Sequence, residues 1–456
     1  MADAVADRRE RAGGTVAPIN PTGLAQAQLG MGEPDWLAQR RLHAWKVYEA
    51  TPMPTEQMEE WRYTDLAHRL PLEKLRAPST VPLPDDPATW PEPLKRTMRD
   101  DHDASGHLVL IGGYVVHTTI QPSLASQGVV LTSLRKAVDE HPELLEEHLA
   151  TEAVPPEDGK LQALNAALWT DGVFLYVPDG VRLESPVRVT SWVSGAGAAY
   201  FTRTLIVAEP GSQISCVDEI LSEDLDSHAL ASTSVEVIAR DCAEIQYVAL
   251  QRLGRGVFYQ SAQRTLADRD STLDSLNVSL GGTTTRIDLN SRLLGPGANS
   301  NMLGLYFGDG DQHFDHNTSQ DHLAPATRSD LLYKGALDGE SRSVFRGIIR
   351  VANRAQQTDA YQTNRNLLLS RGARADSLPK LEIEADDVRC SHGATVGELD
   401  EEALFYLMSR GIARSQAERL IVLGFLGEIL QRLPLGGVAD KVTRAIEGKL
   451  RTAVHA

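Results

Sequence analysis

Residues 206–217, with the sequence IVAEPGSQISCV, contain the pattern that decides the fold. A short apolar run leads into Pro and Gly, which favour a tight turn, and alternating apolar and polar residues follow. Similar breaks recur between about 162 and 390. They are Val177-Pro-Asp-Gly180, Ala208-Glu-Pro-Gly211, Ala239-Arg-Asp-Cys-Ala243, Ala267-Asp-Arg-Asp-Ser271, Leu294-Gly-Pro-Gly-Ala298, Leu337-Asp-Gly-Glu-Ser341 and Leu369-Ser-Arg-Gly-Ala373. This part of the chain is therefore predicted to consist of short strands separated by turns.

The spacing of these breaks separates the candidate β architectures. Counted between residues 180, 211, 242, 270, 297, 339 and 372, the steps are 31, 31, 28, 27, 42 and 33 residues. A period near 30 is typical of stacked coils, in which each coil covers the apolar face of its neighbour. A β-helix is therefore the preferred interpretation. A large β-sandwich or a pair of barrels remains the alternative, although turns there usually come about every 8 to 12 residues.

The predicted β-helix core comprises residues 161–397. The residues before it have a different sequence pattern. Residues 1–30 are rich in Ala, Gly, Pro and Thr without periodicity, which predicts a flexible tail. Residues 31–160 are expected to form a helical or α+β region. It begins with an amphipathic helix from Pro34 that ends before Pro52. The acidic run from Pro142 to Leu149 also has helical character.

Helical patterns return in residues 398–456, which are predicted to form a C-terminal α-helical domain. Asp400 can cap a first helix that ends at Gly411, and Ser415-Gln-Ala-Glu418 has the form of a capping box for a second. A third helix is predicted from four apolar residues spaced four apart. These are Val438, Val442, Ile446 and Leu450.

Composition limits the possible partners and the compartment. The formal net charge of -17 opposes binding to nucleic acid or to anionic membranes, which both require clustered Lys and Arg. The N-terminus carries no apolar signal region, and no run approaches the roughly 18 apolar residues of a membrane span. Only three cysteines occur, so a disulfide framework is not expected. We expect a cytoplasmic protein in which Cys216 and Cys242 pack in the core.

Cys390 and His392 are the strongest candidates for chemistry. They stand two apart in a segment predicted to be the last strand, so their side chains should share one face with Cβ atoms roughly 7 Å apart. Thiolate and imidazole are both ligands of iron-sulfur clusters. Two ligands leave the coordination of a cluster incomplete, which predicts a half-site completed by another subunit. The alternative is that Cys390 is simply a small buried apolar residue.

The stretch from Asp309 to His322 gathers three histidines and four aspartates. His313 and His316 are three apart, which on a strand puts them on opposite faces, and the spacing matches neither a helical His pair nor an EF-hand loop. A solvated turn between coils is therefore favoured over a metal site. His316 alone is retained as a candidate metal ligand, facing the edge where a partner would bind.

Four segments are similar to known motifs. Leu381–Gly397 and the following Asp400–Gly411 resemble the C-terminal motif of the SufB/SufD family. Thr358–Leu369 and Glu60-Trp-Arg-Tyr-Thr-Asp-Leu66 resemble further motifs of that family. The resemblance covers most of the chain after about residue 55. It implies a right-handed parallel β-helix flanked by helical regions, in an assembly subunit of the SUF iron-sulfur cluster system that acts beside SufB and two copies of the ATPase SufC.

Within the family, the chain resembles the partner of SufB more than SufB itself. Cys390-Ser-His392-Gly-Ala-Thr stands where SufB typically has Glu-His-Glu-Ala-Thr, and Gln362–Leu369 lacks the cysteine that SufB carries in the similar segment. The resemblance implies that Cys390 and His392 hold a transient cluster shared with SufB, with none tightly bound to the isolated chain. A SufB-type scaffold that assembles a cluster alone remains the alternative. An exposed β-helix edge also predicts that the isolated chain can form a homodimer.

The C-terminal helices carry more apolar surface than a three-helix unit can bury, because apolar residues nearly encircle the first of them. The resemblance implies that residues 398–434 dock SufC. The residues predicted to contact a partner are Leu404, Phe405, Leu407, Met408, Leu420, Leu423 and Phe425.

No catalytic residues are predicted. The chain contains neither the phosphate-binding Gly-x-x-x-x-Gly-Lys-Ser/Thr motif nor a Gly-x-Ser-x-Gly elbow, so ATP hydrolysis is expected in SufC. The competing hypothesis is a carbohydrate-active β-helix enzyme. The low aromatic content of 5% and the absent secretion signal argue against it.

Overall fold

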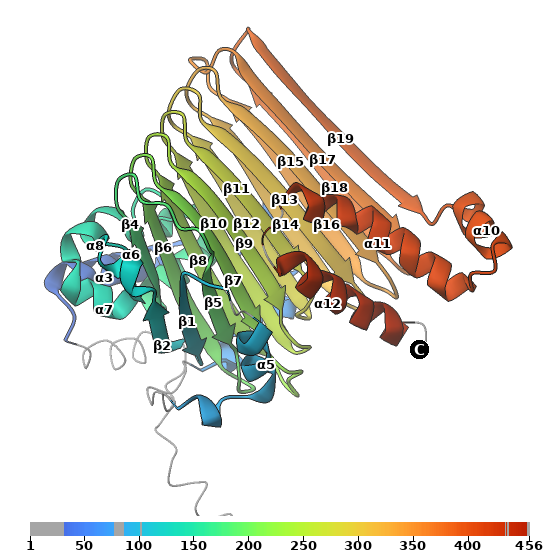
Figure 1. Cartoon of the computed structure of the whole chain (residues 1–456), viewed down its shortest axis with the longest axis horizontal. Coiled ribbons are helices and arrows are strands. Elements are labelled where there is room, and N and C mark those ends of the chain that lie inside the picture. Colours follow the sequence, from blue (N-terminus) through green and yellow to red (C-terminus); the bar gives the residue numbers. More distant parts are fainter. Residues whose placement is uncertain (1–31, 77–85, 101–102, 434, 436, 454–456) are drawn as a thin grey trace, which may run out of the picture.

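The computed structural model describes residues 32–76, 86–100, 103–433, 435 and 437–453, and its centre is a parallel β-helix (Figure 1). The predicted fold is confirmed: a mainly β core stands between an N-terminal α/β region and C-terminal helices. The predicted tail, residues 1–30, lies outside the described residues.

The helices of the described chain are α3 (Asp35–Ala50), η2 (Glu59–Trp61), α4 (Leu66–Arg69), η3 (Leu72–Lys74), η4 (Pro87–Thr89), α5 (Glu92–Asp100), α6 (Pro122–Ala125), α7 (Leu134–Glu140), α8 (Pro142–His148), η5 (Pro156–Asp158), α9 (Lys160–Leu168), α10 (Glu401–Ser409), α11 (Arg414–Arg432) and α12 (Val438–Ala453). The first strands are β1 (Gly106–Ile111), β2 (Tyr114–Ile120), β3 (Val130–Ser133), β4 (Asp171–Val177), β5 (Val187–Trp192), β6 (Ala199–Ala208), β7 (Gln213–Leu221), β8 (Ala229–Ala239), β9 (Glu244–Arg252) and β10 (Val257–Ala267). The later strands are β11 (Thr272–Ser279), β12 (Thr284–Leu293), β13 (Asn299–Gly308), β14 (His313–His322), β15 (Arg328–Leu337), β16 (Arg342–Val351), β17 (Thr358–Leu368), β18 (Arg374–Ile383) and β19 (Val388–Glu398).

Successive strands alternate between two sheets. The even-numbered strands from β4 to β18 lie side by side in one sheet, and the odd-numbered strands from β5 to β19 lie in the other. Neighbours within each of these series pair in parallel. Each coil therefore adds one strand to each sheet, and every coil presents its inner face to the same interior.

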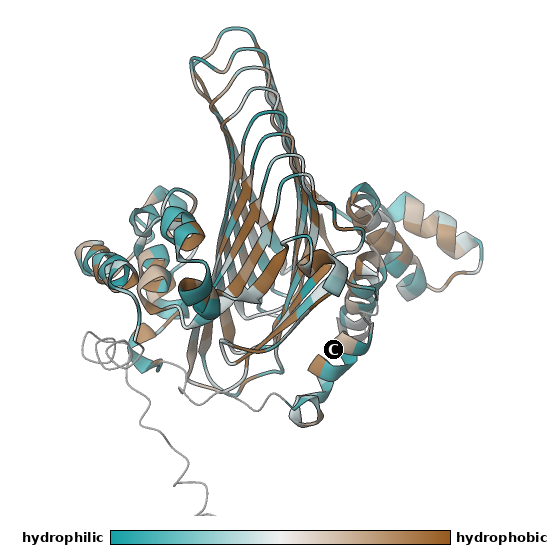
Figure 2. Ribbon diagram, turned by 60° about the vertical axis from the view of Figure 1, so that its left-hand side comes forward, coloured by the Kyte–Doolittle hydropathy of each residue, from teal (hydrophilic) through white to brown (hydrophobic). Residues whose placement is uncertain are grey.

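One edge of the β-helix is a ladder of equivalent turns, visible as the stacked loops in Figure 2. Seven turn residues adopt a left-handed conformation with φ between 56° and 76°. Their amides bond to the next coil, for example Gly211 N to Asp241 O at 2.9 Å and Cys242 N to Arg269 O at 2.8 Å. The seven residues are Gly180, Gly211, Cys242, Asp270, Gly297, Ala326 and Gln357.

The positions of these turns show that the step of 42 residues in the predicted period is wrong. The coils after Gly297 turn on this edge at Ala326 and Gln357, so the period stays close to 30. Gly339, which was counted as the next equivalent turn, lies between β15 and β16 on the opposite edge, and residue 372 lies between β17 and β18. The error arose because Ala and Gln rarely adopt a positive φ, so neither residue marks a turn in the sequence.

Helices cover the outer face of each sheet. Side chains of α3, α7, α8 and α9 form one core with residues from β4, β6, β8 and β10, such as Phe174 and Phe258. Helices α11 and α12 pack on the other sheet, where Val422 and Val442 join a cluster with Val248 and Leu305. The coiled core thus lies between two helical layers on opposite sides (Figure 1).

Most individual elements match their predictions. Helix α3 and the run from Pro142 are helical as predicted, and Asp400 caps α10 by accepting from the amides of Glu402 and Ala403. The predicted capping box is wrong: α11 begins at Arg414 with Ala413 as its N-cap and no side-chain cap. No helix in the described ranges is long and apolar enough to cross a membrane.

Candidate functional site

The C-terminal end of the β-helix is open. Within the described chain, β19 pairs with β17 alone and β18 with β16 alone, so both are edge strands. Cys390 and His392 both lie on β19. On the neighbouring strand β17, Ala360 lies opposite Cys390 and Gln362 lies opposite His392. Residues two apart on a strand share a face, so the thiol and the imidazole stand on the same side of β19. Cys390 is half-buried, whereas His392 is exposed.

The surroundings of Cys390 set its chemistry. Its side chain packs beside the small apolar cluster that contains Ile349, Val351 and Ala360. Burial raises the pKa of the Cys390 thiol, and the carboxylate of Asp359 raises it further, against a lowering effect of a backbone hydrogen bond with Ala360. The thiol is therefore protonated at neutral pH, and an arriving iron ion would have to displace its proton.

Cys390 and His392 together supply one sulfur and one nitrogen donor. No group of three or more His, Cys, Asp or Glu side chains with metal-binding proximity occurs among the residues that the structure describes. An iron-sulfur cluster usually takes four protein ligands. The two donor types therefore suit an iron-sulfur cluster, but two donors supply only part of the coordination that a cluster needs.

The second candidate surface lies on the C-terminal helices, where α10 projects beyond the end of the core (Figure 1). Phe405 is 74% exposed, Tyr406 58% and Met408 42%, and Leu420 on α11 is 51% exposed. These four residues form what we call the α10 apolar patch. Tyr406 was missed in the sequence because its hydroxyl makes tyrosine a weak marker of apolar surface.

Part of the predicted partner surface is not available. Leu404 is fully buried, and Leu423 and Phe425 pack against the apolar cluster between α11 and the sheet. The Phe425 ring also lies 4.5 Å from the Lys334 ammonium. Leu407 is half-buried. The prediction of these residues as direct contacts is wrong for Leu404, because one face of α10 packs inward.

Comparison with known proteins decides the family. The family model described as "SUF system FeS cluster assembly, SufBD core domain" matches residues 191–425, and "SufBD protein N-terminal region" matches residues 101–189. The iron-sulfur cluster assembly protein SufD of Bacillus subtilis is 32% identical over 424 residues, which are 92% of this chain and 95% of that protein. The chain belongs to the SufBD family. It is thus an iron-sulfur cluster assembly protein of the SUF system, and the predicted resemblance to SufD is confirmed.

Other SufBD relatives agree. An iron-sulfur cluster assembly SufBD family protein of Staphylococcus haemolyticus is 28% identical over 415 residues, which are 88% of this chain and 87% of that protein. A SufBD family protein of Staphylococcus aureus is 27% identical over 416 residues with the same coverage. The similarity therefore extends over both helical regions and the coils between them.

In the histidine-rich stretch of this SufBD chain, residues 309–312 form a turn between β13 and β14, but His313–His322 are a buried strand, so the prediction of a solvated turn is wrong for the histidines. His313, Asp315, His316 and His322 on β14 are each at most 2% exposed. His313 Nε2 lies 2.8 Å from Thr64 Oγ1, whose hydroxyl donates to Asp315 Oδ2 at 2.5 Å. The stretch is therefore joined to the Glu60–Leu66 motif, whose sequence position gave no hint of the contact.

His316 does not face a partner edge. Its ring stacks on Tyr306 at 4.8 Å between centroids and meets Tyr333 edge-on at 5.6 Å, inside the coil. Burial lowers the pKa of His316 to about 4, and that of His313 to about 3. Both rings are therefore neutral packing and hydrogen-bonding groups. The prediction of His316 as a ligand at a partner edge is wrong, because aromatic side chains from neighbouring coils enclose it.

The other two cysteines differ from each other. Cys216 is buried as predicted, and burial raises its thiol pKa well above the usual range. Cys242 is exposed, so the prediction of core packing is wrong there. Its left-handed turn position, with φ of 60°, directs it away from the coil interior.

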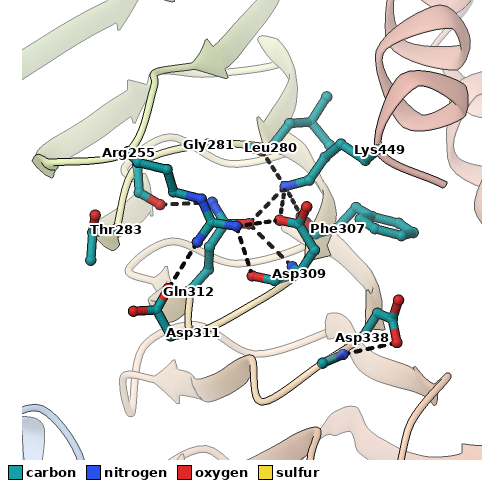
Figure 3. A network of polar contacts seen from close by, with 12 residues as sticks. Arg255, Leu280, Gly281, Thr283, Phe307, Asp309, Asp311, Gln312, Asp338 and Lys449 are labelled. Atoms are coloured by element: carbon teal, nitrogen blue, oxygen red, sulfur yellow. Dashed lines mark hydrogen bonds and ion pairs between the residues drawn. The ribbon is translucent and has the colours of Figure 1, made fainter. Parts of the chain in front are cut away.

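Helix α12 is fixed to the core by a lysine whose side chain is only 16% exposed (Figure 3). Lys449 Nζ donates to the carbonyl oxygens of Leu280 at 2.6 Å and Phe307 at 3.0 Å, and lies 2.9 Å from Asp309 Oδ1. Arg255 binds the same carboxylate at 3.0 Å. Burial lowers the pKa of Lys449 to about 8 despite the opposing effect of Asp309. The network ties the C-terminal helices to turns of three coils.

Proposed function

We propose that this SufBD protein is a non-catalytic subunit that pairs with SufB through the open end of its β-helix. One observation carries the proposal: Cys390 and His392 share a face of an edge strand that has a neighbour on one side only. An edge strand can pair with another chain through its free backbone groups. Ile383 and Val396 at this end, exposed by 40% and 47%, add apolar contact area.

The nascent cluster is the cargo of this interface. Cys390 and His392 contribute two donors, and SufB contributes those that complete the coordination. The raised pKa of the Cys390 thiol supports a transient role, because metal binding must displace the thiol proton. We propose that the work takes place in the cytoplasm, where thiols stay reduced.

The ATPase SufC is proposed to dock on the α10 apolar patch. Three exposed apolar side chains on one short helix form the kind of anchor that protein interfaces use, and aromatic residues dominate it. Movement driven by ATP in SufC would reach the open end directly, because α10 follows β19 with only residues 399 and 400 between them.

The first experiment replaces Cys390 and His392 by Ala in the chain co-expressed with SufB and SufC. Cluster formation on the purified complex, followed by visible absorption under anaerobic conditions, is expected to fall at least tenfold while the three proteins still co-purify. The matched control is Cys242→Ala, which removes an exposed thiol outside the proposed half-site. Normal cluster formation in the double variant would rule out the half-site.

The second experiment tests the docking surface. Phe405→Asp should abolish co-purification of SufC and leave SufB bound, because a charge in an apolar contact remains unpaired. Leu42→Asp on α3 is the matched control, since Leu42 is 53% exposed on the opposite helical layer. Retention of SufC by Phe405→Asp would contradict docking at α10.

A further inference from the structure

A groove of about 880 Å³ lies on the outer face of the even-numbered sheet, and its lining includes neither Cys390 nor any residue of the α10 apolar patch. One wall is the segment from Thr51 to Trp61, which follows α3. The start of α9 closes one side, and the even-numbered strands from β10 to β18 form the floor. Its volume is within the roughly 300–1,000 Å³ range of small-molecule sites.

The wall is held on the sheet by the Glu60–Leu66 motif. The Arg286 guanidinium lies 4.0 Å from the centroid of the Trp61 ring, and its Nη1 donates to the Glu60 carbonyl at 2.7 Å. Thr64 adds its hydrogen bond to Asp315 on β14. The groove is therefore built by contacts that cross more than 200 residues of sequence.

The floor is ordered by the parallel register. Arg264, Asn290, Ser319, Ile348 and Lys380 are aligned across five neighbouring strands and share the outward face. With strands about 4.8 Å apart, such a row extends about 19 Å. The row beside it, two residues earlier on each strand, places Asp288, Asn317, Arg346 and Leu378 next to one another.

The groove is basic within an acidic chain. Its lining has six Lys and Arg side chains against four Asp and Glu, although the whole chain carries a net charge of -17. Several of these cations are neutralised: Arg286 contacts Asp288 and Asp315, and Arg264 contacts Asp158. These pairs stabilise the walls and leave little charge for a ligand.

Arg346 is different. Its side chain is only 16% exposed, and the carboxylate nearest to it, that of Glu59, stands 3.7 Å away on a side chain that is 73% exposed. Its Nε atom has no hydrogen-bond partner among the described residues. A largely buried guanidinium with a weak, displaceable counter-ion suits bidentate recognition of a carboxylate or phosphate.

Apolar side chains stand next to this cation. Ile348 and Leu378 flank Arg346 on the floor, and Pro52 and Met58 face them from the wall. We propose that the groove binds a small organic anion, with its carboxylate or phosphate on Arg346 and its apolar part between Met58 and Ile348. This site is independent of the cluster half-site and of the α10 apolar patch.

The test uses the full chain and the fluorescent anion anilinonaphthalene sulfonate as the probe. Wild-type protein should bind the probe, and inorganic pyrophosphate or succinate should displace it, which also separates phosphate from carboxylate preference. Arg346→Glu should weaken binding at least tenfold, whereas Arg346→Lys, which keeps the charge but loses the bidentate fork, should weaken it by less than Arg346→Glu does. Met58→Glu places a negative charge on the wall, opposite the proposed anion. It should weaken binding without altering the sheet.

Two controls identify the place of binding. Arg371→Glu makes the same charge change in an exposed turn between β17 and β18 and should leave affinity within twofold. Phe405→Asp should also leave it unchanged, and loss of binding there instead would assign the probe to the α10 apolar patch and overturn the proposal. Equal affinity of wild type, Arg346→Glu and Met58→Glu would overturn it too. If a poly-glutamate peptide displaces the probe and neither pyrophosphate nor succinate does, the ligand of the groove is an acidic peptide, and the proposal of a small anion is wrong.

Discussion

The two ends of the β-helix are built from the same coil and finished differently. At the N-terminal end, β4 has β3 on its free side, and β1 and β2 extend the other sheet beyond β5. Every residue of β4 except Tyr176 is buried, whereas no residue of β19 is. A stacked coil needs a cap because its last strand leaves backbone groups and an apolar face uncovered. The chain caps the first coil itself, whereas the described residues leave the last coil uncapped.

The largest expected contrast comes from truncating one side chain at each end. Phe174→Ala on β4 should lower the free energy of unfolding by about 3–5 kcal/mol, because Phe174 is fully buried between the first coil and the N-terminal helices. Val396→Ala on β19 should cost less than about 0.5 kcal/mol, because Val396 is 47% exposed. Urea unfolding midpoints measure both. Similar losses at the two ends would show that the open end is as well packed as the closed one.

A pH-dependent contrast is expected from Asp218, which lies on β7 in the interior of the closed half. Tyr247 donates to its carboxylate at 2.9 Å, and burial raises the pKa of Asp218 to about 6. A raised folded-state pKa stabilises the protein below about pH 4, and this contribution is lost as pH rises through 6. At pH 8, Asp218→Asn should therefore be more stable than wild type by about 2–3 kcal/mol.

The sign of this effect is checked by repeating the measurement at pH 5, where the advantage of Asp218→Asn should be smaller by about 1 kcal/mol. Asp387→Asn is the control at the open end, where the side chain is exposed. It should change stability by less than about 0.5 kcal/mol at both pH values. A pH-independent advantage of Asp218→Asn would mean that its carboxyl is not buried as described.

The smallest change in stability is expected from a substitution in α12, which packs on the side of the β-helix and not at either end. Lys449→Met removes the hydrogen bonds of the buried ammonium, and Asp309 keeps Arg255 as its partner. Amide hydrogen exchange in α12 should reveal a loss of protection of about 1–2 kcal/mol. Lys136→Met on α7, where the side chain is 63% exposed, should have no measurable effect. Equal deprotection of β4 and α12 would contradict a local role for Lys449.

Several features of the fold could be predicted because they depend on neighbouring residues. The turn period gave the coils, the capping residue Asp400 gave the start of α10, and alternation along a strand gave the shared face of Cys390 and His392. The turns at Ala326 and Gln357 were missed, since their left-handed backbone is imposed by the coils above and below and not by their own side chains.

The sequence by itself determined the stacked coil, the helices at its two sides and the placing of Cys390 and His392 two apart on one strand, because strand alternation and helix periodicity repeat over a few residues. Only the tertiary structure decided which of these residues are buried and which are exposed. It enclosed His316 among rings from other coils, exposed Cys242, turned Leu404 inward, and joined Thr64 to a strand 250 residues away. Burial depends on what covers a side chain, and in this molecule the covering segment is usually distant in sequence.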